Sequence, residues 1–389
     1  MKICSGFRFV PAGCVIASEI FLLLLLPHEN WAHGVPRDSA CPCGEASLCE
    51  PIKDTTRKEI YVFSLQNKYS SWLKFDWKKV TTVVSVGYVS QELMCLAHEH
   101  GARVVTIANY SRSKLTDSNA RAQWVAKQLH IVTSNHYDGT NIDFEDVILQ
   151  NQTDLRAGYT ALVRETNQAF KQAQPSYQVT VDVAWSPDCI DLRCYDIQGL
   201  AAASDFLFVM AYDEQSQIFG DCIALANSDF NKTSQGLHKY LSLGIKPEQL
   251  VLGVPWYGYD YPCVSLLKND TCTLKHKPFR GVQCSDAAGR QIDYRVTYPL
   301  LINGSSGGRK WDQSALSPYF NYKDKSTGQM HQVRYDDPMS LGLKYKMAVE
   351  LGLRGVGTWN IDCLDYSDAS YAVQQRQLMF DAFPSYPRH

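Results

Sequence analysis

The sequence predicts an α/β fold, a closed (β/α)8 barrel of parallel strands with a small α+β insertion between the seventh and eighth strands. Short apolar runs rich in β-branched residues alternate with amphipathic stretches along the chain. Such alternation indicates parallel strands joined by helical crossovers. The runs are continuously apolar, as expected for strands buried on both faces. Eight such runs favour a closed barrel, although the pattern alone also fits an open doubly wound sheet.

The expected strands are bounded by turn residues and helical segments. They are Glu59–Ser64, Val80–Val86, Arg103–Ala108, Thr140–Phe144, Gln178–Ala184, Phe206–Ala211, Leu250–Val254 and Gly355–Trp359.

Helices are expected between these strands, where apolar residues recur at helical spacing. An N-cap aspartate followed by a proline, Asp337-Pro338, begins another helix, and Gly352 ends it. The periodic segments are Ser90–His100, Leu155–Phe170 and Thr233–Leu243.

One connection is far too long for a loop. About ninety residues separate the seventh strand from the eighth, against a usual handful. The middle of this connection, Cys263 to Gln332, is rich in Gly, Ser, Lys and Tyr and holds three cysteines. We therefore expect an inserted subdomain over residues 263–336, within a catalytic barrel over 39–389.

The N-terminus is expected to be a signal peptide over residues 1–38, with an approximate end. Lys2 and Arg8 precede the apolar run Ile20–Leu26, and a polar region follows. The run is too short to cross a bilayer as a helix. An uncleaved anchor is the alternative. Export through the secretory pathway, with no membrane attachment after cleavage, is therefore expected.

Cysteine content agrees with export. The chain has 13 cysteines, and setting aside Cys4 and Cys14 leaves 11. An oxidising compartment favours disulfides, and the odd number leaves one thiol free or in an intermolecular bond. Zinc at Cys41 and Cys43 is the weaker alternative, because the spacing lacks a second pair. Surface glycans are expected at some of the five acceptor sites, Asn109, Asn151, Asn231, Asn269 and Asn303.

The charge balance excludes one large class of partner. The chain has 38 basic and 40 acidic residues and a net charge of -2, without a basic stripe. A nucleic-acid partner is therefore not expected. We also expect no metal and no cofactor.

The densest chemical signal is the segment Tyr137 to Asp146, YDGTNIDFED. Side chains alternate along a strand, so Asn141, Asp143 and Glu145 share one face. This face would point into the barrel at the carboxyl end of the strand, where barrel enzymes keep their active sites. Buried carboxylates are costly and unnecessary for packing, although a solvated acidic loop after a strand is the ordinary alternative.

Two neighbouring carboxylates favour acid catalysis. The charge of Asp143 would raise the proton affinity of Glu145. A protonated Glu145 could then give its proton to a glycosidic oxygen.

The acidic segment resembles the Asp-x-x-Asp-x-Asp-x-Glu signature of glycoside hydrolase family 18, the chitinase family. Three further segments resemble the family's later strands in the expected order, and together the matches extend over roughly Lys58 to Tyr366. They are Phe208 to Asp213 (FVMAYD), Leu250 to Gly258 (LVLGVPWYG), and Tyr335-Asp336-Asp337 through Gly355 to Trp359.

The resemblance implies a retaining mechanism assisted by the substrate, an exception to the scheme with two catalytic carboxylates. Glu145 would protonate the leaving oxygen and later activate water, while the 2-acetamido oxygen of the sugar attacks the anomeric carbon. Asp143 would hold the acetamido N–H, and Tyr212 would donate its hydroxyl to the acetamido oxygen. The further residues expected to contact the sugar are Asp213, Met210, Trp359, Asn141 and Asp138.

Aromatic rings suit the C–H face of a sugar, and Trp359 is expected beneath the reacting unit. Trp185 and Trp256 also follow expected strands, and each could contact sugar or pack in the core. Met210 could equally be a filler of the core.

The chain departs from the family pattern in two places. Asn141 replaces the second aspartate, so Asp143 loses a like-charged neighbour and the pH profile is open. Val105 to Asn109 replaces the Ser-x-Gly-Gly pattern of the third strand.

The resemblance implies an oligosaccharide containing N-acetylglucosamine as substrate, a monomer, and a lysosomal location. Two rival functions remain. A chitinase-like lectin would keep the barrel and bind without cleaving, and an endo-acting chitinase would cut elsewhere in the sugar chain.

Overall fold

The computed structural model describes residues 40–386. The expected signal peptide, residues 1–38, and the two cysteines within it lie outside this part of the chain. Among the described residues, no helix combines the length and the apolar character that a membrane span requires.

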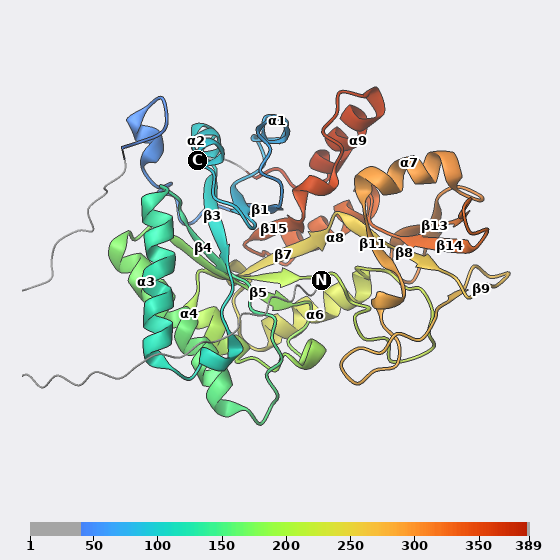
Figure 1. The fold of residues 1–389 in the computed structure, drawn as a ribbon, viewed down its shortest axis with the longest axis horizontal. Helices are drawn as coiled ribbons and strands as arrows, with labels where there is room; N and C mark the ends of the chain where they lie inside the picture. The colour runs from blue at the N-terminus through green and yellow to red at the C-terminus, as the bar shows by residue number, and fades with distance from the viewer. Residues whose placement is uncertain (1–39, 387–389) are drawn as a thin grey trace, which may run out of the picture. The chain divides into compact units, whose positions relative to one another are not determined.

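Eight parallel strands close into a barrel, which confirms the predicted fold and excludes the open sheet (Figure 1). Neighbours around the barrel follow the order β1-β15-β7-β6-β5-β4-β3-β2. The strands are β1 (Glu59–Ser64), β2 (Thr82–Ser85), β3 (Arg103–Ala108), β4 (Gly139–Ile142), β5 (Gln178–Ala184), β6 (Phe206–Met210), β7 (Leu250–Pro255) and β15 (Gly355–Trp359).

The predicted bounds of β1, β3, β5 and β15 are confirmed, whereas β4 differs. This strand was expected to reach Phe144, and it ends at Ile142. The backbone N–H of Asp143 still donates to the carbonyl of Ala108 at 2.9 Å, so the chain stays hydrogen-bonded to β3 for one residue beyond the end of β4. The chain then leaves the sheet, and Glu145 lies on a loop.

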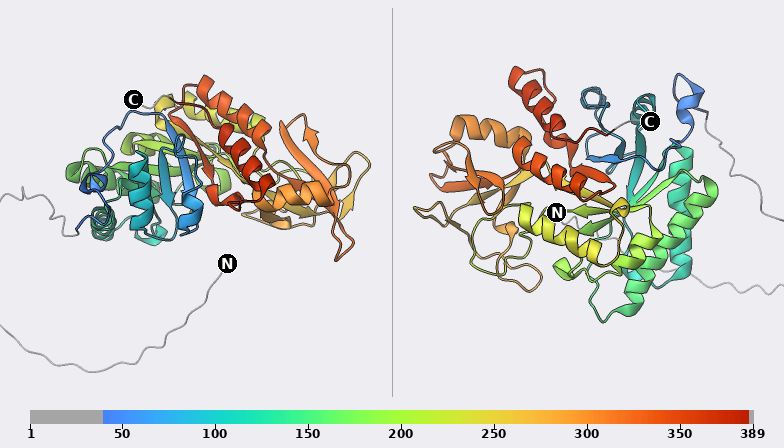
Figure 2. Two further views of the ribbon diagram at one scale, coloured as in Figure 1. Left: turned by 90° about the horizontal axis from the view of Figure 1, so that it is seen from above. Right: turned by 180° about the vertical axis from the view of Figure 1, so that it is seen from behind.

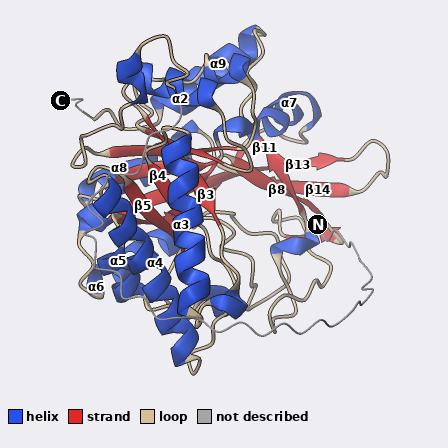
Figure 3. Ribbon diagram, turned by 60° about the vertical axis from the view of Figure 1, so that its left-hand side comes forward, coloured by secondary structure: helices blue, strands red, loops and turns tan. Residues whose placement is uncertain are grey.

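Helices surround the barrel, and α3, α4 and α5 pack against one another in turn (Figure 3). The helices are α1 (Tyr69–Trp72), α2 (Gln91–Glu99), α3 (Ser118–Ser134), α4 (Thr153–Ala173), α5 (Ile197–Ala203), α6 (Phe230–Ser242), α8 (Pro338–Glu350) and α9 (Ser370–Asp381).

The predicted helix signals act as expected. Asp337 caps α8 by accepting from the N–H groups of Met339 and Ser340, and Gly352 follows with a φ of +70°. The sequence did not indicate α3, because its segment SNARAQWVAKQLHIVTS is largely polar and shows little apolar periodicity.

The long connection forms an antiparallel sheet with one helix, which lies to one side of the barrel (Figures 1 and 2). The five strands have the order β11-β8-β14-β13-β12. The first of them along the chain, β8, already begins at Tyr257. The elements are β8 (Tyr257–Pro262), β9 (Ser265–Leu266), β10 (Cys272–Thr273), β11 (Arg290–Asp293), α7 (Tyr294–Gly304), β12 (Lys310–Asp312), β13 (Ser317–Lys323) and β14 (Met330–Arg334).

Five disulfides join ten of the eleven described cysteines, and Cys363 is left as a buried thiol. Cys41 and Cys43 belong to two different disulfides, which overturns the zinc alternative because a disulfide sulfur has no thiolate to offer. The pairs are Cys41–Cys49, Cys43–Cys95, Cys189–Cys194, Cys222–Cys284 and Cys263–Cys272.

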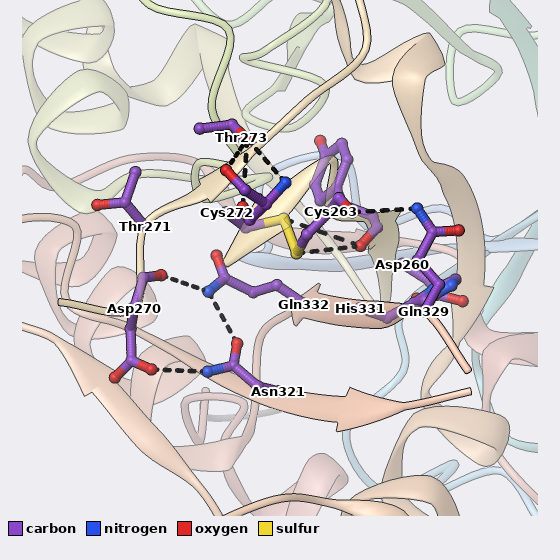
Figure 4. The surroundings of a disulfide bond; sticks show 12 residues. Asp260, Cys263, Asp270, Thr271, Cys272, Thr273, Asn321, Gln329, His331 and Gln332 are labelled. Atoms are coloured by element: carbon purple, nitrogen blue, oxygen red, sulfur yellow. Dashed lines mark hydrogen bonds and ion pairs between the residues drawn. A yellow bond between two sulfur atoms is a disulfide. The ribbon is translucent and has the colours of Figure 1, made fainter. Parts of the chain in front are cut away.

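Hydrogen bonds fix the hairpin β9–β10 to the inserted sheet beside the Cys263–Cys272 disulfide (Figure 4). Gln332 donates to the carbonyl of Asp270 at 2.8 Å and to Asn321 Oδ1 at 2.9 Å. Asn321 in turn donates to Asp270 Oδ1 at 2.8 Å. The hairpin is therefore held by both covalent and polar contacts.

Candidate active site

A cavity of about 220 Å³ opens where β4, β5 and β6 end, between the barrel and the inserted subdomain. Four predicted site residues line it, namely Glu145, Met210, Tyr212 and Asp213. Four other lining residues, which were not predicted, come from the inserted subdomain. The complete lining is Glu145, Trp185, Ile190, Asp191, Arg193, Met210, Tyr212, Asp213, Ser216, Tyr259, Phe279, Arg280 and Asp286.

Glu145 presents its carboxylate to this cavity. Its side chain is 52% exposed, so it is neither packed in the core nor fully in solvent. Arg193 donates from Nη1 to Glu145 Oε2, and its Nη2 reaches Asp191 Oδ2 at 3.2 Å. Arg193 stands on the loop closed by the Cys189–Cys194 disulfide. This loop therefore orients the Glu145 carboxylate.

Asp143 is less exposed than Glu145 and does not line the cavity. Phe144, on the opposite face, packs on Tyr159 of α4 with ring centroids 4.6 Å apart. Asp143 Oδ1 is buried without a hydrogen-bond partner. Burial raises the pKa of Asp143 to about 7, the charge of Glu145 adds to the rise, and Arg193 opposes it. Burial and the neighbouring charge of Glu145 thus raise the proton affinity of Asp143.

Tyr212 and Asp213 follow β6 at the wall of the cavity. Burial raises the pKa of Tyr212 well above its usual value, so the phenol stays protonated and can donate. Asp213 adopts a left-handed backbone conformation, with φ +51°. Its Oδ1 accepts from the hydroxyls of Tyr257 at 2.6 Å and Tyr259 at 3.0 Å. Both tyrosines belong to the inserted subdomain, which therefore holds Asp213 in place.

The three tryptophans divide between cavity and core. Trp185 lines the cavity, and Lys232 lies 5.9 Å above its ring. Trp256 is 1% exposed and packs on Phe380 and Phe383, so its core interpretation holds. Trp359, the expected floor, is half-buried and packs on Phe63 at 5.1 Å, and it does not line the cavity.

Asn141 is expected to contact substrate, but its side chain is fully buried below the cavity. Its Nδ2 donates to Thr180 Oγ1 at 3.0 Å and to Asp182 Oδ1 at 2.8 Å. Both partners stand on β5. The structure therefore places Asn141 beside the site rather than in it.

Asp138 is not brought to the cavity, because it precedes β4 and lies at the opposite, amino end of the barrel. Its Oδ1 accepts from the N–H of Ile52 at 2.8 Å, and its Oδ2 accepts from the N–H of Val104 at 2.7 Å. His98 Nε2 also lies 2.8 Å from Oδ2. Asp138 thus joins the N-terminal segment to the barrel, and we leave it out of the proposed site.

Sequence reasoning missed Arg193, Asp182, Tyr259, Arg280 and Asp286. A lone acid in the apolar strand QVTVDVA and a lone arginine between two cysteines were available signals for Asp182 and Arg193. The other three come from the inserted subdomain, whose position no pattern in the sequence fixes. Burial and the charge of Asp213 raise the pKa of Asp286 to about 7.

All five glycan acceptor asparagines are exposed, and two of them donate from their side-chain nitrogen within the protein. Asn231 donates to the carbonyl of Ser314 at 2.6 Å, and Asn303 donates to the carbonyl of Pro299 at 3.0 Å. Glycan attachment at any of them stays a prediction.

The barrel, its acidic cavity and the inserted sheet agree with the comparison with protein families. The model of glycosyl hydrolases family 18 matches residues 95–363, and the chain belongs to this family. The di-N-acetylchitobiase of Mus musculus is 47% identical over 93% of this chain and 96% of its own length. The di-N-acetylchitobiase of Homo sapiens is 46% identical over 88% of this chain and 87% of its own.

Solved structures of low identity share the fold. The chitinase of Chromobacterium violaceum superposes with a TM-score of 0.62 at 17% identity, over 82% of this chain and 99% of that one. YKL-39, solved in the presence of chitooligosaccharides, superposes with a TM-score of 0.65 at 16% identity, over 83% and 99%. At such identities the likeness concerns the fold alone.

Proposed function

We propose that this chain is a di-N-acetylchitobiase, a glycosidase that hydrolyses the β-1,4 bond between N-acetylglucosamine units. The names of the mammalian relatives support this assignment. The cysteine-rich start CPCGEASLCEPI and the motif DGTNIDFED favour it within the family. The bond would be that of the chitobiose core of asparagine-linked glycans, cleaved from the reducing end.

One observation carries the catalytic proposal. The Glu145 carboxylate stands at the cavity, half exposed, and Asp143, half-buried with its Oδ1 atom fully enclosed, lies two residues before it. A proton donor must reach a glycosidic oxygen from such a position, and a second carboxylate behind it can serve the sugar.

Each residue has a defined part in the proposed reaction. Glu145 protonates the leaving oxygen while the 2-acetamido oxygen attacks the anomeric carbon and forms an oxazolinium ion. Asp143 accepts the acetamido N–H and offsets the positive charge, and Tyr212 donates to the acetamido oxygen. Glu145 then activates the water that attacks the anomeric carbon and opens the oxazolinium ring. Asp213 and Met210 line the space for the sugar.

Location and assembly belong to the same proposal. Five disulfides are typical of a chain that folds in the secretory pathway. We propose delivery to the lysosome, action as a monomer on oligosaccharides that contain N-acetylglucosamine, and glycans on some of the five acceptor sites.

Glu145→Gln tests the catalytic proposal, because glutamine keeps the size of the side chain but has no acidic proton to transfer. We expect kcat on a chitobiose substrate to fall by at least about a hundredfold, with thermal unfolding little changed. Glu92→Gln makes the same chemical change at an exposed glutamate of α2 and should keep full activity.

The products distinguish the rival functions. Mass analysis of a substrate labelled at its reducing end should show release of a single labelled N-acetylglucosamine. Internal cleavage would favour an endo-acting chitinase, and binding without turnover by the unchanged protein would favour a lectin. Near-normal activity of Glu145→Gln would remove the mechanism.

A further inference from the structure

Asp182 is a buried carboxylate that the proposed mechanism does not use. It stands in β5, is 3% exposed, and has apolar neighbours on both sides along the strand. Burying a carboxylate is costly unless its charge is compensated. No ion pair within residues 40–386 includes Asp182 or Asp143. Asp182 accepts a hydrogen bond from Asn141, but no cation in this part of the chain offsets its charge.

Two cross-barrel contacts show where Asp182 points. Gln178 Nε2 donates to Glu59 Oε1 at 3.1 Å, and Thr180 Oγ1 lies 2.8 Å from Tyr61 Oη. Glu59 and Tyr61 stand on β1, which is not a neighbour of β5 in the barrel. Residues 178, 180 and 182 alternate with outward-facing residues, so Asp182 also points into the barrel interior.

The strand register places Asp143 beside Asp182. Asn141 pairs with Thr180 and Ile142 pairs with Val181, so the next step along the two strands brings Asp143 to the level of Asp182. Registered residues of neighbouring parallel strands point to the same side. Asn141 fixes the arrangement by donating to Asp182 Oδ1 at 2.8 Å.

Two carboxylates side by side in a buried site do not both ionise readily, and they share a proton. Burial raises the pKa of Asp182 well above its usual value, and the charge of Asp143 adds to the rise. The other ionisable groups around the pair are Glu145, Arg193, and the phenols of Tyr61, Tyr159 and Tyr212. Burial raises the pKa of all three phenols, so they stay neutral. The charge of the pair therefore depends on its own proton.

We propose that Asp182 is the proton partner of Asp143 and receives its proton when a sugar acetamide binds. The O–H bond of Asp143 breaks, an O–H bond to Asp182 forms, and the pair keeps one negative charge throughout. Asp143 is then free to accept the acetamido N–H, and the proton returns when the sugar leaves. Asp182 is a positioning residue, because it acts on the substrate only through Asp143. The inference rests on the proposed function.

Proton release on binding tests the partnership without turnover. Glu145→Gln protein is titrated with the β-1,4-linked disaccharide of N-acetylglucosamine in two buffers of different ionisation enthalpy, over the acidic range up to about pH 7. We expect a pH range in which the Glu145→Gln protein releases almost no proton. Addition of Asp182→Asn should cause release of up to about one proton in that range, since asparagine cannot accept it.

An exchange of the two side chains separates proton transfer from a structural role. Asn141→Asp combined with Asp182→Asn keeps one amide and one carboxylate in hydrogen-bond contact and restores an acid beside Asp143. Made in the Glu145→Gln protein, this exchange should release no more protons on disaccharide binding than Glu145→Gln alone. With Glu145 intact, it should recover most of the activity that Asp182→Asn loses.

The outcomes decide between the two proposals. Equal proton counts for Glu145→Gln protein with and without the single added change Asp182→Asn would overturn the partnership while leaving the proposed function intact, and so would release of a proton by the exchanged variant. If Asp182→Asn does not fold, the exchanged variant alone decides. Absence of both disaccharide binding and turnover by the unchanged protein would instead refute the proposed function.

Discussion

Asp138 and Asp143 show how the same residue type takes different roles at the two ends of one strand. Asp138 lies at the amino end of β4 and compensates its burial with backbone N–H groups and His98. Asp143 lies beyond the carboxyl end of β4 and has a buried oxygen without a partner. A buried carboxylate oxygen without a hydrogen-bond partner is typical of a reactive group, and an acid whose oxygens are all hydrogen-bonded is typical of a structural group.

Asp138→Asn should therefore reduce stability and spare catalysis. The change removes the charge opposite His98, whose pKa is raised by Asp138 against the effect of burial. We expect the free energy of unfolding to fall by roughly 3 kcal/mol, as for other broken buried pairs. Denaturant unfolding measures this loss, and kcat/KM below the transition should be unchanged. A selective rise in KM with normal stability would instead make Asp138 a substrate contact.

At the level of elements, loops after strands carry most of the site. Glu145 follows β4, Trp185 to Arg193 follow β5, and Tyr212 and Asp213 follow β6. The loop after β5 contains a disulfide between residues only five apart, whereas Cys43–Cys95 links residues 52 apart. The two disulfides are therefore expected to serve different purposes.

Removal of each disulfide should separate activity from stability. Replacing Cys43 and Cys95 by serine should lower the free energy of unfolding by about 4 kcal/mol and leave kcat nearly unchanged, because the disulfide closes a long loop and neither cysteine lines the cavity. Replacing Cys189 and Cys194 should cost only about 2 kcal/mol. It should lower kcat more strongly, since Arg193 would no longer hold Glu145.

Denaturant unfolding and steady-state kinetics on the two serine double variants check this pair of expectations. The same ratio of lost activity to lost stability in both variants would contradict a special role for the loop after β5.

For the whole molecule, buried acids set the direction of its pH dependence. Burial raises the pKa of Asp143 and of Asp286 to about 7, and that of Glu214 to about 8. A carboxyl whose pKa is raised in the folded state stabilises the fold at a pH below its pKa in the unfolded chain. This contribution is lost as the pH rises through the pKa of the folded state. Acids with a lowered pKa, such as Asp54 and Asp312, lose their contribution only below about pH 4.

The free energy of unfolding should therefore fall as the pH rises from about 5 to 8, by on the order of 1 kcal/mol per pH unit for each acid that titrates, and the melting temperature should fall with it. Glu214→Gln should flatten the upper part of this fall, because Glu214 has the highest of the three pKa values and does not itself line the cavity. Scanning calorimetry over this range measures both. A melting temperature that rises towards pH 8 would contradict the expected direction.

The sequence by itself determined the alternation of eight strands with helices and the face on which the acids lie, and the structure showed that the strands close into a barrel. Periodicity decides which residues are buried, and the alternation of YDGTNIDFED places Asp143 and Glu145 opposite Phe144. The sequence did not predict α3, because that segment is largely polar and shows little apolar periodicity, and it did not predict the early end of β4.

Only the tertiary structure decided which groups meet. The contacts of Asn141 with Asp182, of Glu145 with Arg193, and of Asp213 with two tyrosines of the inserted sheet join residues 41, 48, 44 and 46 positions apart. Charge and burial act over a few ångströms in space, whatever the distance along the chain. For this reason the sequence gives the identity of the acids, and the folded barrel sets their protonation.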